Sequence, residues 1–297
     1  MKPKTLESYF TAFAWCCGIA LFSAVSCVIF FLIYKGWNSL TLELIFGSTK
    51  PVDAILLRKQ VFDGLFPAIA GTFSLVIISV AIAIPLGIAT GIYMAEYAQG
   101  NLKRAFSLFY DILAAVPSIL VGLFGFSAAI WLHHNFSKNI YPCMLISAFS
   151  LAFLVLPYII RTTQVTLENL PQSVRLTALA LGASKRQNIF YILIPCAVSG
   201  IISGIILAIG RCAEDTAVIM LTGVVAMAGV PKSILGSYEA LPFYIYYISS
   251  QYIDSKELAT GYGASLLLMG VCISLYVISY LIKIVLQKRF LTGGRRL

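Results

Sequence analysis

Long apolar segments separated by short polar ones dominate this sequence. Six stretches lack any charged residue and reach the length of about 20 residues that a helix needs to cross a bilayer: residues 13–34, 66–94, 112–132, 141–160, 189–210 and 258–282. Since backbone polar groups must be satisfied within the segment in lipid, these stretches are expected to be helices. The pattern predicts an all-α integral membrane protein with six transmembrane helices, the second of them tilted or bent because it contains Pro85.

Composition supports the same class. The chain has 297 residues, of which 60% are hydrophobic and 11% charged, and its mean hydropathy is +0.91. So much apolar surface does not fit inside one water-soluble core. The first apolar stretch is longer than the core of a signal peptide and is followed by no A-x-A site, so we expect it to be retained as a helix.

Lysines and arginines indicate the orientation. If both termini face the cytoplasm, the inside segments hold 13 of the 21 and the outside loops hold seven, with Arg211 left inside the membrane region. The positive-inside rule therefore predicts cytoplasmic N and C termini in a multi-pass inner-membrane protein. Basic loops beside anionic lipid headgroups account for the net charge of +9, and no nucleic-acid partner is expected.

Candidate metal and catalytic chemistry is sparse. The seven cysteines lie in or beside apolar spans without a C-x-x-C spacing, and His133 and His134 have no acidic or cysteine partner at ligand spacing. Neither G-x-x-x-x-G-K-[ST] nor H-E-x-x-H occurs. We therefore expect a chain that holds no metal or cofactor, is not an enzyme and does not itself hydrolyse ATP.

The polar stretch 161–188 between the fourth and fifth spans has the pattern of a helical elbow. Pro171 suits a first helical position, and 3.6-residue periodicity places a set of residues on one face of a short helix: Val174, Thr177, Ala178 and Leu181. Gly182 is suited to a left-handed turn, and Ser184 can cap a second helix running toward Pro195. Such an elbow could dock another protein or lie on the lipid headgroups, and spacing alone favours neither.

In a second polar block, GRCAEDTAVIMLTG at 210–223, the charged residues Arg211, Glu214 and Asp215 follow the uncharged run 189–210. Charges in a membrane segment are costly and often mark a transport route. At helical spacing Arg211 reaches Glu214 and Asp215. Arg211 could merely neutralise these acids, or its planar fork of donors could bind an oxyanion that the acids help to position and release.

The elbow resembles the "EAA" loop of ABC importer permeases, E-A-A-x-x-x-G followed by I-x-x-P, through Ala178, Gly182, Ile192 and Pro195. Leu176 stands where that family has Glu and Thr177 where it has the first Ala, which leaves one polar contact to the ATPase open. The resemblance implies a coupling helix at about 171–188 that sits in a cleft of a cytoplasmic ATPase. The implied coupling residues are Thr177, Ala178, Gly182, Ala183, Ser184 and Pro195.

Residues 210–216 resemble the G-R-x-x-x-x-T segment of phosphate importer permeases. Further stretches that look like this family lie at 63–76, 84–98, 114–126 and 240–250. The resemblance implies a type I ABC importer permease fold and a substrate pathway that contains Arg211, Glu214, Asp215 and Thr216, with Pro117 and Ser118 of the P-S-I-x-x-G-L-F run. It also implies a second permease subunit as heterodimer partner, two cytoplasmic ATPases that bind ATP and Mg, and an extracytoplasmic phosphate-binding protein.

Three local patterns predict structural features on physical grounds, independently of the resemblance. Pro117 removes an amide donor and opens its helix, either to line a cavity with carbonyls and the Ser118 hydroxyl or simply to kink for packing. Gly200 and Gly204 form a small-x-x-x-small face suited to close helix packing, within the chain or against a partner permease. The aromatic stretch 242–252 is expected to form an interfacial helix.

These inferences divide the chain into an N-terminal helix with an external loop (1–62), an importer core (63–286) and a basic cytoplasmic tail (287–297). An importer of another oxyanion, such as molybdate, tungstate or sulfate, fits the charge cluster equally well. A membrane enzyme using Glu214 and Asp215 as paired carboxylates lacks a nucleophile-base pair and leaves the elbow unexplained.

Overall fold

A computed structural model describes residues 3–56, 58–138 and 141–293, where regular structure is helical apart from one bridge between Val224 and Tyr238. The long helices are α1 (Pro3–Gly36), α4 (Phe66–Glu96), α5 (Gly100–Ala115), α6 (Ser118–Asn135), α7 (Met144–Glu168), α10 (Ile194–Glu214) and α13 (Ser255–Gly293). The shorter elements are η1 (Trp37–Ser39), α2 (Leu42–Phe46), α3 (Pro51–Ile55), α8 (Gln172–Ala180), α9 (Lys185–Asn188), η2 (Ile189–Leu193), α11 (Ala217–Thr222) and α12 (Leu241–Gln251).

Within the described residues, five helical segments are long and apolar enough to cross a membrane, and a sixth span results if the bent pair α5 and α6 counts as one. The all-helical prediction of six spans is confirmed in this sense. The third span predicted over 112–132 is broken at Pro117, where the helix was expected to open: α5 ends at Ala115 and α6 begins at Ser118 with a bend of 95°. Val116 is extended, as a residue before proline prefers, and Pro117 has no amide to continue the helix.

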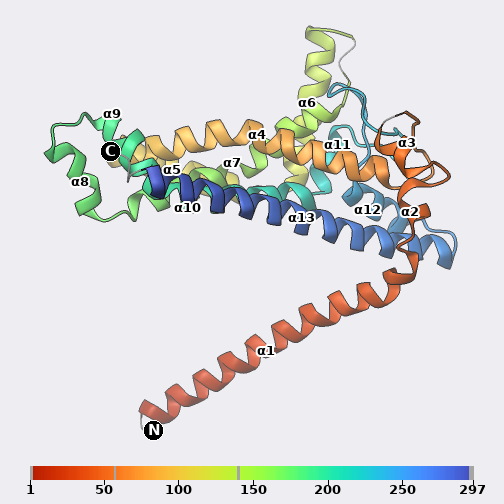
Figure 1. The fold of residues 1–297 in the computed structure, drawn as a ribbon, viewed down its shortest axis with the longest axis horizontal. Coiled ribbons are helices and arrows are strands. Elements are labelled where there is room, and N and C mark those ends of the chain that lie inside the picture. The colour runs from red at the N-terminus through yellow and green to blue at the C-terminus, as the bar shows by residue number, and fades with distance from the viewer. Residues whose placement is uncertain (1–2, 57, 139–140, 294–297) are drawn as a thin grey trace.

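The core is a bundle in which α4, α7, α10 and α13 run alongside one another (Figure 1). Two glycines of α4 allow its close approach to α7: a Cβ on Gly87 would lie 2.7 Å from the Ile159 side chain, and one on Gly91 would lie 2.6 Å from Thr163. Small residues at a helix contact let two backbones approach closely. Pro85 lies inside α4, which continues unbroken to Glu96.

The predicted close-packing face of the fifth span is also present. A Cβ on Gly200 would lie 2.3 Å from the Thr166 hydroxyl oxygen, and one on Gly204 would lie 1.9 Å from that of Thr162. Both threonines belong to α7 of the same chain, so this face packs internally and is not left free for a partner permease. The glycines are therefore required by the α7–α10 contact.

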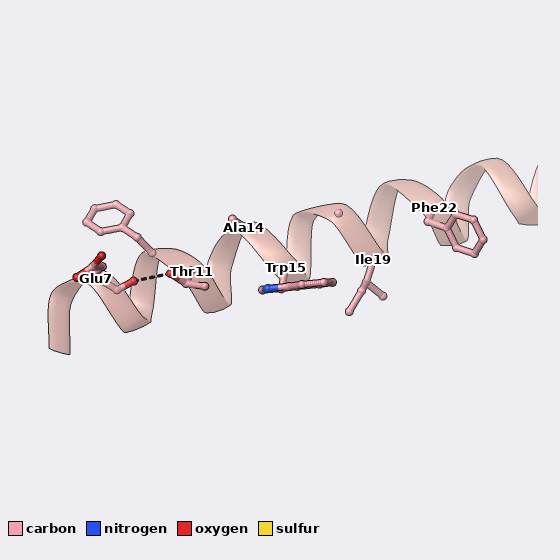
Figure 2. Close-up of a pocket in the computed structure, with 8 residues that line it drawn as sticks. Glu7, Thr11, Ala14, Trp15, Ile19 and Phe22 are labelled. Carbon is pink, nitrogen blue, oxygen red and sulfur yellow. Dashed lines mark hydrogen bonds between the residues drawn. The ribbon is translucent and has the colours of Figure 1, made fainter. Parts of the chain in front are cut away.

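Helix α1 diverges from the bundle and meets it through its C-terminal end (Figure 1). There Gly36 packs against Tyr262 and Leu266 of α13, and the Phe31 and Tyr262 rings meet edge to face at 5.7 Å. Figure 2 shows that the hollow along α1 is lined by one helix alone, with the Thr11 hydroxyl donating to the Glu7 carbonyl at 2.9 Å. That hollow is an open helix surface and not an enclosed site.

The start of α1 and the end of α13 lie toward the α8–α9 end of the bundle, whereas α2, α3 and α12 lie at the opposite end (Figure 1). The basic tail was predicted at 287–297, and residues 294–297 of it lie outside the described residues. The aromatic stretch 242–252, which was expected to form an interfacial helix, is helical as α12 (Leu241–Gln251).

Candidate translocation and coupling sites

The elbow begins where the sequence predicts, with one adjustment. Pro171 is the N-cap of α8 and not its first helical residue, since its backbone is extended (φ −56°, ψ 145°). Its carbonyl accepts the amide of Arg175. On the predicted face Val174 is half-buried and Ala178 buried, whereas Thr177 and Leu181 are exposed. The hydroxyl of Thr177 donates to the Ser173 carbonyl of its own helix at 2.6 Å.

Gly182 forms the turn of the elbow in the left-handed conformation, with φ +83°. The amide of Ala183 donates to the Ala178 carbonyl at 3.0 Å, and the amide of Gly182 donates to the Leu179 carbonyl at 3.0 Å. This pair of bonds is the Schellman motif, which satisfies the last carbonyls of a helix and needs a residue with positive φ. The spacing of Ala178, Gly182 and Ala183 is thus explained by how α8 ends.

Ser184 caps the second limb of the elbow, as predicted. Its hydroxyl accepts from the Gln187 amide while the Gln187 side chain accepts from the Ser184 amide, a complete capping box. The second limb is not a separate helix, however, because α9 passes directly into the π-helical turn η2 and then into α10. Pro195 lies in the first turn of α10, half-buried.

The elbow exposes a compact apolar surface at its tip. Leu181 is 84% exposed, Tyr191 is 75% exposed, and Leu176 is 54% exposed at the position where the EAA pattern has Glu. A shallow hollow beside the tip is lined by Ala178, Leu181, Gly182, Ala183, Gln187 and Tyr191, among others. Exposed apolar side chains such as Leu176 and Leu181, which precede the candidate span that begins at Lys185, are typical of a protein contact.

The predicted charge cluster forms at the end of α10 opposite the elbow. Arg211 Nη1 lies 3.0 Å from Glu214 Oε1, and Arg211 Nη2 lies 3.5 Å from Asp215 Oδ2. The side chains differ sharply in exposure, at 34% for Arg211, 62% for Glu214 and 2% for Asp215. Arg211 and Glu214 therefore face the outside of this chain, and Asp215 faces its interior.

Asp215 has a backbone role that spacing does not reveal. It ends α10 with an extended backbone, and its Oδ1 accepts the amide of Val218 at 2.9 Å, which anchors the start of α11. Thr216, the N-cap of α11, is half-buried and its side chain caps no amide. The acid next to the break therefore organises the backbone, and Glu214 is the acid exposed beside Arg211.

The two stretches that resemble phosphate importer permeases meet in space. A Cβ on Gly122, the glycine of the P-S-I-x-x-G-L-F run, would lie 3.0 Å from the Ala217 carbonyl oxygen and 3.1 Å from the Val218 Cα. Pro117 is exposed and Ser118 half-buried, about one helical turn before that contact. The structure thus brings α6 onto α11, immediately after the Arg211 cluster.

The segment from α11 to α12 is held by buried polar contacts. Glu239 Oε1 accepts the amides of Ala228 at 2.9 Å and Gly229 at 2.8 Å. Burial raises the pKa of the Glu239 carboxyl, an effect that these two amide bonds partly offset. A Cβ on Gly71 of α4 would lie 2.0 Å from the Glu239 carbonyl oxygen, so the segment crosses the backbone of α4 directly.

The family described as "Binding-protein-dependent transport system inner membrane component" matches residues 87–290, which include the elbow and the Arg211 cluster. The chain belongs to this family. It is therefore a multi-pass inner-membrane permease subunit of an ABC transporter whose other components include an ATPase and a binding protein. A subunit of this kind transports and does not catalyse.

Individual proteins similar to this permease agree with the family. The phosphate transport system permease protein PstA of Haemophilus influenzae is 32% identical over 84% of this chain and 84% of its own length. The phosphate transport system permease protein PstA 1 of Mycobacterium tuberculosis (strain CDC 1551 / Oshkosh) is 31% identical over 80% of this chain and 74% of its own. An inward-facing structure of the MetNI methionine ABC transporter has a chain with the same fold, with a TM-score of 0.55 at 17% identity, covering 80% of this permease and 99% of that chain.

Two features of the permease have no counterpart in the sequence reading. One is an ion pair between Arg175 of α8 and Glu96 at the end of α4, 79 residues apart. The other is the Glu239 contact with the amides of residues 228 and 229. Nothing in local spacing pairs these residues, although each acid was visible as a rare charge near a long apolar stretch.

Proposed function

We propose that this permease translocates inorganic phosphate into the cytoplasm. In the proposed complex it forms a heterodimer with a second, related permease in the lipid bilayer and contacts two cytoplasmic ATPases, which bind ATP and Mg. An extracytoplasmic binding protein delivers phosphate. The printed names of the relatives in Haemophilus influenzae and Mycobacterium tuberculosis support phosphate as the substrate.

The observation that carries the proposal is the exposed Arg211–Glu214 pair. A guanidinium offers several donors in a plane, which suits a tetrahedral oxyanion, and a neighbouring carboxylate accepts from a protonated phosphate or competes with it. A transport site must release what it binds, and the competing acid limits affinity. In this proposal Arg211 and Glu214 contact the anion, Asp215 and Thr216 support them, and Pro117 and Ser118 line the pathway.

The elbow is the proposed coupling element. Its exposed tip at Leu181 and Gly182 would enter the ATPase cleft, with Thr177, Ala183, Ser184 and Pro195 fixing its shape. The helical stretch from Lys185 through η2 and α10 separates the tip from Arg211, roughly 39 Å at the usual rise per residue. In this proposal the elbow, both termini and the basic tail (287–297) lie in the cytoplasm, and residues 1–62 precede an importer core of residues 63–286.

Another oxyanion is the alternative substrate, because the Arg211 cluster alone would also suit molybdate, tungstate or sulfate. The test is ATP-dependent uptake of radiolabelled phosphate into proteoliposomes that hold the full complex, with each of these anions as competitor. If molybdate, tungstate or sulfate displaces phosphate at lower concentration, the substrate assignment is wrong and the permease assignment remains.

The same assay tests the site. Arg211→Ala should reduce uptake about tenfold or more, since a hydrogen bond to a charged group contributes about 1.5–3 kcal/mol. Lys283→Ala is the matched control: it also removes one cation, from α13, where Lys283 donates to the Ser203 hydroxyl. If uptake survives Arg211→Ala in an assembled complex, Arg211 is only a counter-ion for its neighbouring acids.

A further inference from the structure

The elbow is joined to the bundle by more than its own chain. Its first limb follows α7 and its second limb leads into α10, so these two helices are connected to it covalently. The structure adds a third helix, α4, whose C-terminal residues Glu96 and Tyr97 receive contacts from both limbs.

The first limb reaches α4 through Arg175. Its Nη1 lies 2.7 Å from Glu96 Oε1, and these side chains are only 22% and 8% exposed. Its Nη2 donates to the carbonyl of Leu167, the penultimate residue of α7. A single guanidinium thus connects α8 with the ends of two other helices. A charge-assisted bond of this length, partly withdrawn from water, is much less screened than a surface pair.

The second limb reaches the same point through Lys185. Its ammonium donates to the backbone carbonyl of Glu96 and lies 4.5 Å from the centre of the Tyr97 ring. A cation is favoured there by the unsatisfied carbonyls at a helix C-terminus and by the face of the aromatic ring. Both limbs therefore bind within two residues of one another on α4.

The two limbs are also tied together. The side-chain amide of Asn188, which is buried, donates to the Arg175 carbonyl at 2.8 Å. Beneath them Leu167, Ile189 and Leu193 form a buried cluster against which Ile92 and Ala95 of α4 pack. The elbow, with the Schellman turn at its tip, is therefore held as one body on the end of α4.

We propose that Glu96, Arg175 and Lys185 form a clamp through which the elbow moves α4 together with α7 and α10. The three are positioning residues and do not contact the transported anion. This proposal rests on the proposed coupling role of the elbow. It adds that α4, which has no direct covalent link to the elbow, also receives the elbow's motion.

The N-terminal end of α4 contacts the segment through which this motion can be transmitted further. The helix runs without interruption from Phe66 to Glu96, about 46 Å at the usual rise per residue. Near its start, the Thr72 hydroxyl accepts the amide of Leu241 at 2.9 Å, and Gly71 lies against the Glu239 carbonyl. A displacement of α4 by the elbow therefore reaches the segment that follows α11 at the opposite end of the bundle.

The test measures phosphate uptake and ATP hydrolysis together, in proteoliposomes holding the full complex. Glu96→Gln and Arg175→Gln should keep co-purification with the ATPase and should leave ATP hydrolysis close to the wild-type rate. Phosphate taken up per ATP should fall about fivefold or more, the scale of a typical coupling between sites. Loss of folded protein would lower both rates equally and leave this ratio unchanged, so the ratio separates coupling from stability.

Two further variants sharpen the result. The charge swap Glu96→Arg with Arg175→Glu should recover most of the ratio, because it restores an ion pair between the same positions. Lys103→Gln is the matched control, since it removes a 2.7 Å pair with Glu168 at the end of α7 but removes no contact between α4 and the limbs of the elbow. It should leave the ratio unchanged.

An unchanged ratio in Glu96→Gln, in a complex whose wild type couples normally, overturns the clamp and leaves the proposed function intact. Loss of the ATPase from the Glu96→Gln complex also overturns it, because the pair would then serve docking. If the wild-type complex takes up no phosphate, or co-purifies with no ATPase, the proposed function itself fails. These outcomes are separate readings of one experiment.

Discussion

The carboxylate of Asp215 accepts a hydrogen bond from the amide of Val218 at 2.9 Å and fixes the start of α11. The same carboxylate lies 3.5 Å from Arg211 and is almost fully buried. The chain thus uses one acid both to restart a helix and to hold the cation of the proposed anion site.

Asp215→Ala should destabilise the protein by about 1–3 kcal/mol, because it leaves the Val218 amide without its acceptor. Asp215→Asn keeps an acceptor oxygen and should cost less, and Glu214→Ala, which removes an exposed acid, should cost about 1 kcal/mol or less. Thermal unfolding of each purified variant in detergent measures the difference. Equal losses for Asp215→Ala and Glu214→Ala would contradict the assignment of the two acids.

Gly182→Ala should weaken the elbow by about 1–2 kcal/mol, because φ of +83° is unfavourable for a residue with a Cβ even though no atom obstructs it. Gly182→Asn should cost less, since asparagine tolerates this conformation better than alanine. Hydrogen exchange of the amides of residues 178–183 and co-purification with the ATPase are the measurements. If alanine and asparagine behave alike, backbone conformation is not what this position requires.

Gly71→Ala should destabilise the contact between α4 and the segment before α12, because a Cβ there would lie 2.0 Å from the Glu239 carbonyl oxygen. Forced overpacking of this kind costs about 1–3 kcal/mol. Gly270→Ala in α13 is the control, since no atom lies within 4 Å of its Cβ, and it should be neutral or stabilising. The unfolding temperatures of the two variants should therefore move apart, and a common shift would refute the close crossing.

Glu239 should make stability fall as pH rises. Its pKa in the folded protein is above the ordinary value of 4.5 because of burial, so from about that pH upward the folded state holds more protons than the unfolded state and stability decreases. Glu239→Gln cannot ionise and should flatten this part of the profile. The check is the unfolding midpoint of both proteins in detergent across this range, and an identical slope in the two would exclude Glu239 as its source.

The spans were predictable because each depends on a local run of apolar residues long enough for a bilayer. The bend between α5 and α6 was not, since the 112–132 run shows no charge where the chain changes direction. Pro117 marked the position of the break, but the sequence around it did not indicate whether the helix would only kink or would end and restart with a bend of 95°. The bend accompanies the packing of Gly122 against α11, a contact between distant segments that local sequence does not reveal.

The candidate sites divide in the same way. Gly182 and Ser184 were identified correctly because turns and caps are made by neighbours a few residues away. Glu214 and Asp215 looked equivalent because both lie within one helical turn of Arg211, and only the tertiary burial of Asp215 separates their roles. The Glu96–Arg175 pair joins residues 79 positions apart, which no local pattern could connect.

Because the π-helical turn η2 lies between Gly182 and Pro195, the number of residues between them affects how the elbow is rotated about the axis of α10. One additional residue in a helical turn rotates everything beyond it by about 100° about the helix axis. The azimuth of the elbow relative to α10 is therefore set by the number of residues in 189–193 as well as by their chemistry. Deleting one residue there would leave a continuous helix but would rotate the elbow tip about the axis of α10. A substitution would leave the direction of the tip unchanged.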